Sequence, residues 1–259
     1  MPRLGYLILA GGALALVIAV FVHRMPQPVA YHFFADQRAC LGIPNFFNVA
    51  SNLAFALTGA LALAWMYAQR AALRARFIDP REAWLWVALY VSTFFVTFGS
   101  AYYHLAPDNP RLLWDRLPMA LTAPAFVAIV CADRFGLRAA AWTGGVLAIA
   151  SAASLVYWRS TMAPGPDNVW PYFVMLYGSL LCAVIVMLVF RSRYTHAHAA
   201  WASVLIYGIA MAFDDTLDET LYAYGQAVSG HSLKHMLAAI ALLWLAWGSL
   251  RVRRPLAPG

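Results

Sequence analysis

The stretch GSAYYHLAPDNPRLLWDRLPM, residues 99–119, ends one long apolar segment and begins the next. Ser100 and His104 are four residues apart, so their side chains share one face if the segment is a helix. A short turn follows at residues 107–110, and Asp115 lies one turn into the second apolar segment. A serine, a histidine and an aspartate therefore lie at the ends of two hydrophobic segments joined by a short turn.

A second polar pair lies far downstream, in GHSLKHMLAA, residues 230–239. His231 and His235 are again four residues apart and again begin an apolar segment. Three hydrophobic segments thus carry polar side chains at one of their ends. The functional interpretation depends on whether those ends meet in space.

The composition is that of a polytopic membrane protein. The chain has 259 residues, of which 63% are hydrophobic and 11% charged, whereas soluble domains have about 25% charged residues. The three cysteines form no CxxC pair, so neither a disulfide framework nor a thiolate metal site is indicated. The net charge of +7 does not indicate nucleic-acid binding, because the arginines lie in short loops between apolar segments.

About 20 mainly apolar residues are needed to cross the hydrocarbon core, and eight segments qualify. They are residues 4–22, 46–67, 83–104, 112–131, 139–157, 170–190, 199–213 and 232–250. The first could be a signal peptide, but it lacks an Ala-x-Ala cleavage site, so we interpret it as a retained helix. The predicted fold is an all-α transmembrane bundle, with an N-terminal helix and loop at 1–30, a membrane domain at 31–250 and a solvent-exposed tail at 251–259.

Loop charges predict the orientation. If the N-terminus is cytoplasmic, eight crossings place 12 of the 18 basic residues in cytoplasmic segments and leave six outside or near the outer ends. This is the bias that membrane proteins show. Both termini are then cytoplasmic. All the polar residues at the segment ends described above then lie on the outer face, at similar depth.

The histidines predict a metal site. Two imidazoles four residues apart on a helix can chelate one metal, whereas a lone histidine near a helix end is more often a hydrogen-bonded interfacial residue. The segment HSLKH lacks the glutamate of HExxH, so the zincin mechanism is not indicated. With His104 at matching depth, His231 and His235 complete a three-nitrogen set. Three protein ligands and an open water position are the arrangement of a catalytic zinc.

Asp115 is a candidate catalytic group. A carboxylate within a membrane span costs on the order of 3 kcal/mol unless it is paired or solvated. The structural alternative is a salt bridge to Arg111, Arg116 or Lys234. Ser100 alone would be a packing serine and matters because it shares a face with the histidine that follows it.

Three further polar features are open to structural or functional interpretation. Lys234, the only lysine, could extend to the outer interface or anchor a carboxylate or lipid head group. The polar residues between 45 and 52 are interpreted as interhelical hydrogen-bonding groups. The acidic cluster at 214–219 could bind a cation, but we interpret it as a solvated loop.

Together these motifs resemble the signature of the alkaline ceramidase family, which belongs to a wider group of membrane hydrolases with the progestin and adipoQ receptors. The resemblance rests on Ser100-x3-His104, on Asp115 in Asp-Arg-Leu-Pro-Met, on His231-x3-His235 and on the polar stretch at residues 42–52. It covers residues 31–250. It implies a seven-helix core at 46–250, preceded here by an extra helix.

The resemblance also implies a site. His104, His231 and His235 would hold Zn²⁺, with Ser100 and Asp115 as the catalytic or supporting pair. Eukaryotic members carry an acidic cluster that binds Ca²⁺, but here the matching glutamate position is Asn45 and only Asp36 nearby is acidic. Calcium control is therefore not expected.

The resulting hypothesis is a zinc-dependent intramembrane amidohydrolase that cleaves ceramide or a ceramide-like membrane lipid into a long-chain base and a fatty acid. The short loops favour a bacterial inner-membrane protein with its metal site near the periplasmic face. Alternatives are a lipid esterase or phospholipase of the same fold, a receptor or scaffold with a structural metal, and a haem or ion carrier. The exact lipid and the oligomeric state are not predicted.

Overall fold

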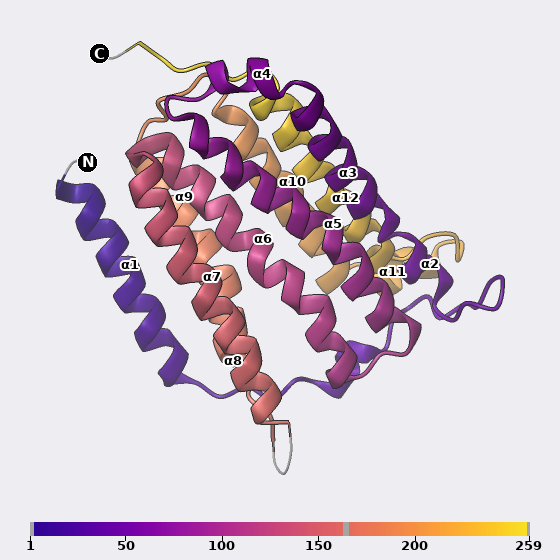
Figure 1. The fold of residues 1–259 in the computed structure, drawn as a ribbon. Helices are drawn as coiled ribbons and strands as arrows, with labels where there is room; N and C mark the ends of the chain where they lie inside the picture. Colours follow the sequence, from indigo (N-terminus) through magenta and orange to yellow (C-terminus); the bar gives the residue numbers. More distant parts are fainter. Residues whose placement is uncertain (1–2, 163–165, 258–259) are drawn as a thin grey trace.

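The computed structural model describes residues 3–162 and 166–257, with backbone alone for residues 3, 4, 6, 9 and 215. Within those residues the chain is all-α, and its long helices run side by side in one bundle (Figure 1). The main elements are α1 (Arg3–Val22), α2 (Phe46–Ala50), α3 (Leu53–Ala68), α4 (Arg70–Leu73), α5 (Ala83–Leu105), α6 (Asn109–Phe135), α7 (Leu137–Ser160), α8 (Trp170–Phe173), the π-helical η4 (Val174–Gly178), α9 (Ser179–Val189), α10 (His198–Asp215), α11 (Asp218–Ala223), α12 (Gly230–Leu245) and the π-helical η5 (Ala246–Leu250).

The predicted class is confirmed: this is an all-α protein embedded in a membrane. Six helical segments among the described residues are long and apolar enough to cross a bilayer. They are Phe46–Ala68, Pro80–Leu105, Asn109–Phe135, Leu137–Ser160, Trp170–Val189 and Gly230–Leu250. The other two predicted segments are also helical, but Ala10–Val22 and His198–Asp214 are shorter apolar helices.

The two ends of the bundle are formed by different parts of the chain. The last turn of α5 and the first turns of α6 and α12 lie at one end, hereafter the histidine end. Both chain termini and α4 lie at the other, hereafter the opposite end (Figure 1). Helices far apart in the sequence therefore begin or finish together, as the alternation of crossings predicts.

The backbones of α5 and α6 approach closely at the histidine end, where a glycine of α5 meets a backbone carbonyl of α6. Pro118 lies inside α6 and has no N–H, so the carbonyl of Trp114 receives no helical hydrogen bond from position 118. Gly99 on α5 lies against this carbonyl, and a Cβ at position 99 would be 2.1 Å from the Trp114 oxygen. Only glycine allows this approach, which brings the backbone of α5 against Trp114 and Asp115.

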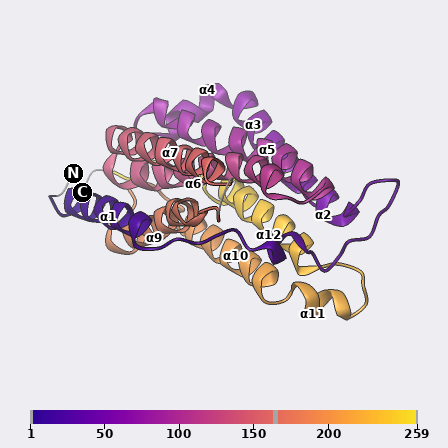
Figure 2. The same cartoon turned by 90° about the horizontal axis from the view of Figure 1, so that it is seen from below.

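The segment between α1 and α2 crosses the histidine end (Figure 2). The Met25 carbonyl accepts from the Val169 amide at 2.9 Å, and the Met25 amide donates to Asn168 Oδ1 at 3.1 Å. Further along, the two ring nitrogens of His32 lie 3.0 Å from the Tyr103 hydroxyl and 3.0 Å from Asn109 Oδ1. The crossing segment is thus held against α5, α6 and the start of α8.

The predicted exposed tail is in part wrong. Arg253 is 0% exposed, and its Nη2 donates to Asp133 Oδ1 at 2.5 Å. Its guanidinium lies over the rings of Tyr194, Phe77 and Trp86, 3.7, 5.1 and 5.2 Å from their centroids. These residues form the Arg253 cluster. The tail folds back because this charge has an acid and three aromatic rings to bury it; residues 258–259 lie outside the described part.

Candidate metal centre

Three histidines from two helices meet at the histidine end. His104, in the last turn of α5, is 1% exposed, and His231 and His235, in the first turns of α12, are 4% and 5% exposed. One ligand nitrogen from each lies within 4.8 Å of the other two. The Nε2 atoms of His104 and His231 are 3.2 Å apart. The structure therefore brings the predicted three-nitrogen set together.

Two of the imidazoles are oriented through their second nitrogens. Asp214 Oδ1 lies 2.6 Å from His231 Nδ1. Ser51 Oγ lies 2.8 Å from His235 Nδ1, and the same hydroxyl donates to the Asn48 carbonyl. Both contacts favour a proton on Nδ1 and leave the Nε2 lone pair free for a ligand. An outer partner on the remote nitrogen is typical of metal-binding histidines.

The third imidazole is held differently. His104 Nδ1 is buried and has no partner among the described residues. The backbone oxygen of the same residue accepts from Asn45 Nδ2 at 2.9 Å. The hydrogen bonding to other elements that was predicted for this polar segment is found for Asn45, Asn48 and Ser51. The side chain of Asn52 instead donates to the Asn48 carbonyl within the same segment.

The residues fit a small tetrahedral metal ion. Zinc–nitrogen bonds of about 2.0–2.1 Å place two tetrahedral ligand atoms roughly 3.3 Å apart, close to the 3.2 Å found here. Neutral imidazole is a preferred donor for zinc. Within the described residues, these three histidines are the one group of three potential ligands whose ligand atoms all lie within 4.8 Å of one another.

The prediction of a solvated acidic loop is wrong for Asp214 and Asp218. The side chain of Asp214 is only 12% exposed and bridges His231 to Lys234, whose Nζ lies 2.8 Å from Oδ2. Asp218 Oδ1 accepts from the backbone amide of His231 at 2.7 Å, and its Oδ2 accepts from the amide of Ala35. The side chain of Asp215 lies outside the described part.

Lys234 does not extend to the surface. Its side chain is 15% exposed and ion-pairs with Asp214, so extension to the interface is excluded in this conformation. It nevertheless lines the same pocket as the histidines. Binding of a substrate head group by Lys234 stays a prediction.

The start of α12 fixes the two histidines against α10. Ser229 caps the helix by accepting from the amide of Ser232 at 3.2 Å. A Cβ at Gly230 would lie 2.1 Å from the Phe213 carbonyl oxygen, so only glycine permits this contact. The close approach brings His231 within hydrogen-bonding distance of Asp214.

Asp115 is buried and unpaired. It is 9% exposed and lines the pocket with the histidines, yet its carboxylate has no hydrogen bond or ion pair among the described residues. The three cations that could have neutralised it are engaged elsewhere: Arg111 with Asp108, Lys234 with Asp214, and Arg116 with Gln27. The salt-bridge alternative therefore does not hold.

Ser100 is less favourably placed than the sequence suggested. It is 2% exposed and lies one turn before His104, but it is not among the residues that line the pocket. Its hydroxyl could reach a bound ligand only after a local rearrangement. Its catalytic role stays a prediction with less support than that of Asp115.

Phe34 covers the histidines from the crossing segment. Its ring is 6% exposed and lies 4.7 Å from the ring of His104 and 4.5 Å from that of His231, centroid to centroid. Sequence reasoning missed this cover because no local pattern marks it. Nearby, Asp36 is ion-paired with Arg38; the expectation about calcium stays a prediction.

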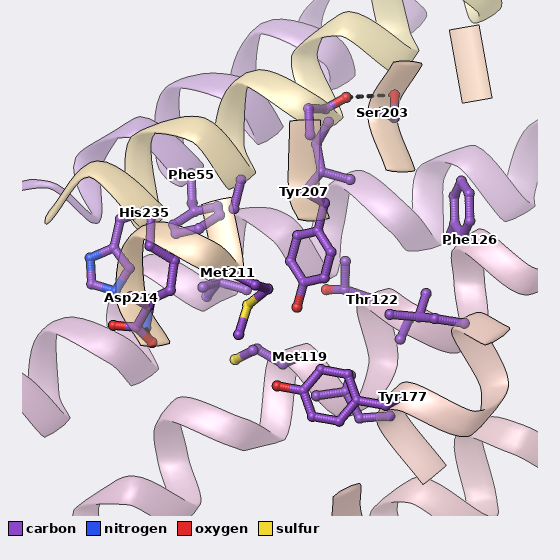
Figure 3. A pocket seen from close by; sticks show the side chains of 18 of the residues that line it. Phe55, Met119, Thr122, Phe126, Tyr177, Ser203, Tyr207, Met211, Asp214 and His235 are labelled. Atoms are coloured by element: carbon purple, nitrogen blue, oxygen red, sulfur yellow. Dashed lines mark hydrogen bonds and ion pairs between the residues drawn. The ribbon is translucent and has the colours of Figure 1, made fainter. Parts of the chain in front are cut away.

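An apolar pocket extends from the histidines into the bundle. It has a volume of about 210 Å³ and is lined mainly by apolar side chains of α5, α6, α9, α10 and α12. In Figure 3, His235 and Asp214 lie at one end and Ser203 at the other, with Met119 and Tyr207 between them.

Comparison with known proteins identifies no family. No protein-family model matches the chain. No curated protein matches it either.

Proposed function

We propose that the protein is a zinc-dependent intramembrane amidohydrolase that cleaves the amide bond of ceramide or a ceramide-like lipid, releasing a long-chain base and a fatty acid. One observation carries the proposal. Three clustered imidazoles and an unpaired buried carboxylate, Asp115, line one apolar pocket within a membrane-embedded bundle. Metal ligands, a proton acceptor and an apolar chamber are the parts that hydrolysis of a lipid amide requires.

Each residue has a distinct role in this proposal. A zinc ion held by His104, His231 and His235 would lower the pKa of its bound water to about 7. Asp115 would accept the proton of the attacking water and deliver it to the leaving amine. Asp214 would keep the His231 ring in the ligating tautomer. Ser100 would donate a hydrogen bond to the developing oxyanion.

The helix arrangement supports entry of the substrate from the membrane. α9 and α10 follow each other along the chain, yet they make little contact with one another, and both line the pocket. Val184 on α9 and Val204 on α10 are examples of the lining side chains. An acyl chain could therefore lie between these helices with its amide at the depth of the histidines.

The finer topology belongs to the same proposal. The helices from α2–α3 to α12 would form a seven-helix ceramidase-like core, with α1 as an additional crossing. The excess of basic residues at the opposite end favours a cytoplasmic location for that end and for both termini. In a bacterial inner membrane, the histidine end would then face the periplasm.

The alternatives receive different support. A lipid ester differs from an amide in its leaving group, and the same residues could cleave it. Axial haem ligation is poorly supported, because axial ligands lie on opposite faces of the porphyrin, whereas the Nε2 atoms of His104 and His231 are 3.2 Å apart. A structural metal in a receptor or scaffold gives no role to the unpaired Asp115.

Metal analysis combined with lipid turnover tests the proposal. Purified protein should contain one zinc per chain and release fatty acid from an amide lipid, and a chelator should abolish release. Matched amide and ester lipids with the same chains then separate amidohydrolase from esterase. One bound zinc without turnover of either lipid would favour a structural metal instead.

A further inference from the structure

Arg116 is buried within aromatic rings next to the candidate catalytic carboxylate. It is 2% exposed. Its Cζ lies 4.6 Å from the ring centroid of Trp158, 5.0 Å from Tyr172, 5.2 Å from Phe173 and 5.5 Å from Tyr31. With Gln27, these residues form the Arg116 cage. The aromatic faces stabilise the cation but supply no counter-charge.

No carboxylate neutralises this guanidinium among the described residues. Its polar partner is a side-chain amide: Arg116 Nη2 donates to Gln27 Oε1 at 2.7 Å. Asp167 shares neighbours with the cage, but it makes no ion pair with Arg116. Its two oxygens accept instead from the Gln27 backbone amide at 2.9 Å, from Trp158 Nε1 at 2.6 Å and from Asn109 Nδ2 at 3.3 Å.

Three buried polar atoms of the cage have no hydrogen-bond partner within residues 3–162 and 166–257. They are Arg116 Nη1, Gln27 Nε2 and the Tyr172 hydroxyl. The two nitrogens are donors only, and the hydroxyl can donate. Buried donors left unpaired are costly, as is an unneutralised charge away from water. A water molecule could accept from these donors, but only an anion would also balance the charge.

The cage and the pocket share a wall. Arg116 directly follows Asp115, and Tyr31 both borders the cage and lines the pocket. Tyr172 lies one helical turn before Leu176, another pocket residue. Tyr31 is also the most exposed wall of the cage, at 38%. A group attached to a ligand in the pocket could therefore enter the cage past Tyr31.

We propose that the Arg116 cage binds an oxyanion on the head group of the lipid substrate. The group is a carboxylate, phosphate or sulfonate carried by the amine portion, close to the scissile amide. This choice of substrate class rests on the proposed function, but binding of the anion does not require turnover. Oxygen acceptors matched to an arginine, an amide and a phenol satisfy all three unpartnered groups.

A matched pair of lipids tests the proposal. N-palmitoylglycine carries a carboxylate two bonds from the amide nitrogen, whereas N-palmitoylethanolamine carries a hydroxyl at a similar distance. Binding to full-length protein is measured in neutral detergent, in the Asp115→Asn background so that neither lipid is consumed. We expect at least tenfold tighter binding of the acid, a preference that Arg116→Gln abolishes.

Tyr172→Phe provides a variant that keeps the ring. Because it removes an unpartnered hydroxyl, it should not lower the melting temperature of the ligand-free protein. It should nevertheless weaken binding of N-palmitoylglycine three- to tenfold and leave N-palmitoylethanolamine unchanged. Tyr90→Phe is the matched control, since that buried phenol donates to the Leu242 carbonyl outside the cage.

Three results would overturn the assignment. The first is equal affinity for the two lipids when the cage residues are unchanged. The second is a preference for N-palmitoylglycine that neither Arg116→Gln nor Tyr172→Phe reduces. The third is complete displacement of N-palmitoylglycine by millimolar phosphate or acetate. The last result would assign the cage to a small soluble anion. If the protein preferred N-palmitoylglycine but hydrolysed no amide lipid, the anion site would be supported and the proposed hydrolase activity would be wrong.

Discussion

An arginine is buried among aromatic rings at each end of the bundle, but only one of the two meets an acid. Arg253, at the opposite end, is ion-paired with Asp133 at 2.5 Å. Arg116, at the histidine end, bonds to the neutral Gln27. Arg253 also retains two nitrogens without partners, but its charge is neutralised within the chain. The charge of Arg116 is not.

The buried carboxylates at the two ends differ in the same way. Glu82, near the Arg253 cluster, accepts from the Tyr194 hydroxyl at 2.6 Å and lies 3.9 Å from Arg193. Asp115 has no such partner among the described residues. Groups that stabilise the fold are thus matched by other residues of the chain. Unmatched groups lower stability, so their presence beside three imidazoles supports the proposed binding and chemistry.

Loss of one imidazole should have the largest effect on the histidine end. His235→Ala removes one of three nitrogens, so we expect the zinc content to fall from one per chain to nearly none and turnover to vanish. Metal analysis of the purified variant measures this. His196→Ala is the control, because that histidine lies in the exposed segment between α9 and α10 and bonds to its neighbour Thr195. If the His235→Ala variant still contained one zinc per chain, the three histidines would not be the metal site.

Asp115→Asn should separate activity from stability. An asparagine cannot accept the proton, so turnover should fall by about 10²–10⁴, which is roughly 3–5 kcal/mol of the barrier. Because the carboxylate supports no other residue, the melting temperature and the zinc content should not decrease. A variant with normal turnover would show that another group is the base. If the variant unfolded, Asp115 would have to be a group that stabilises the fold through other residues of the chain.

Arg253→Leu should have the converse effect. It leaves Asp133 buried without its cation, which costs about 3 kcal/mol or more of unfolding free energy. The double variant Arg253→Leu/Asp133→Leu should recover much of the loss. Denaturant unfolding of the detergent-solubilised protein measures both. If Arg253→Leu cost no more stability than Arg116→Gln, the contrast between the two ends would be wrong.

Asp214→Asn should weaken the metal centre without abolishing it. Loss of the carboxylate behind His231 typically costs 10–100-fold in metal affinity, or about 1.4–2.7 kcal/mol. Competition with a zinc chelator of known affinity measures the change. Thr216→Val, on the neighbouring turn, is a control, since that hydroxyl only bonds back to the Ala212 carbonyl. Equal affinities in the two variants would mean that Asp214 serves Lys234 alone.

The smallest effect is expected at the Asp36–Arg38 pair of the crossing segment, in which the carboxylate is buried but the guanidinium is partly exposed to water. Burial raises the pKa of the Asp36 carboxyl, but the hydrogen bonds and charge of Arg38 lower it more, so the pKa lies below its ordinary value. A lowered pKa stabilises the fold above about pH 4 and loses this contribution as pH falls further. Arg38 is 39% exposed, so solvent screens its charge and Arg38→Gln should lower the free energy of unfolding only slightly at neutral pH. If the loss of unfolding free energy caused by Arg38→Gln increased as the pH was lowered, this expected direction would be wrong.

Much of the fold could be predicted from the sequence because membrane crossing constrains length and polarity so strongly. The predicted segment 83–104, for example, corresponds to α5 (Ala83–Leu105). The meeting of the histidines followed from counting crossings, since four crossings lie between the end of α5 and the start of α12, and an even number returns the chain to the same side. Length alone was less decisive for α10, whose apolar part, His198–Asp214, is shorter than the six long spans.

The partners of the site could not be predicted, because they depend on contacts between distant segments. Asp214 stands among other acids, as a solvated loop would, and only the turn back to α12 brings Lys234 beside it. Phe34 and Arg253 come from segments whose local sequence looks like linker and tail. Arg116 was expected to orient the protein or to pair with Asp115. The cage around it is built from three separate stretches of chain, at residues 27–31, 158 and 172–173.

The contact between Gly99 and the Trp114 carbonyl has a consequence for how closely the chemistry can be held. A Cβ at position 99 would press on the peptide backbone of Trp114, which yields less readily than the end of a side chain. The distance between the two helices beside Asp115 is therefore set by a glycine hydrogen, and a methyl group there would force the backbones apart.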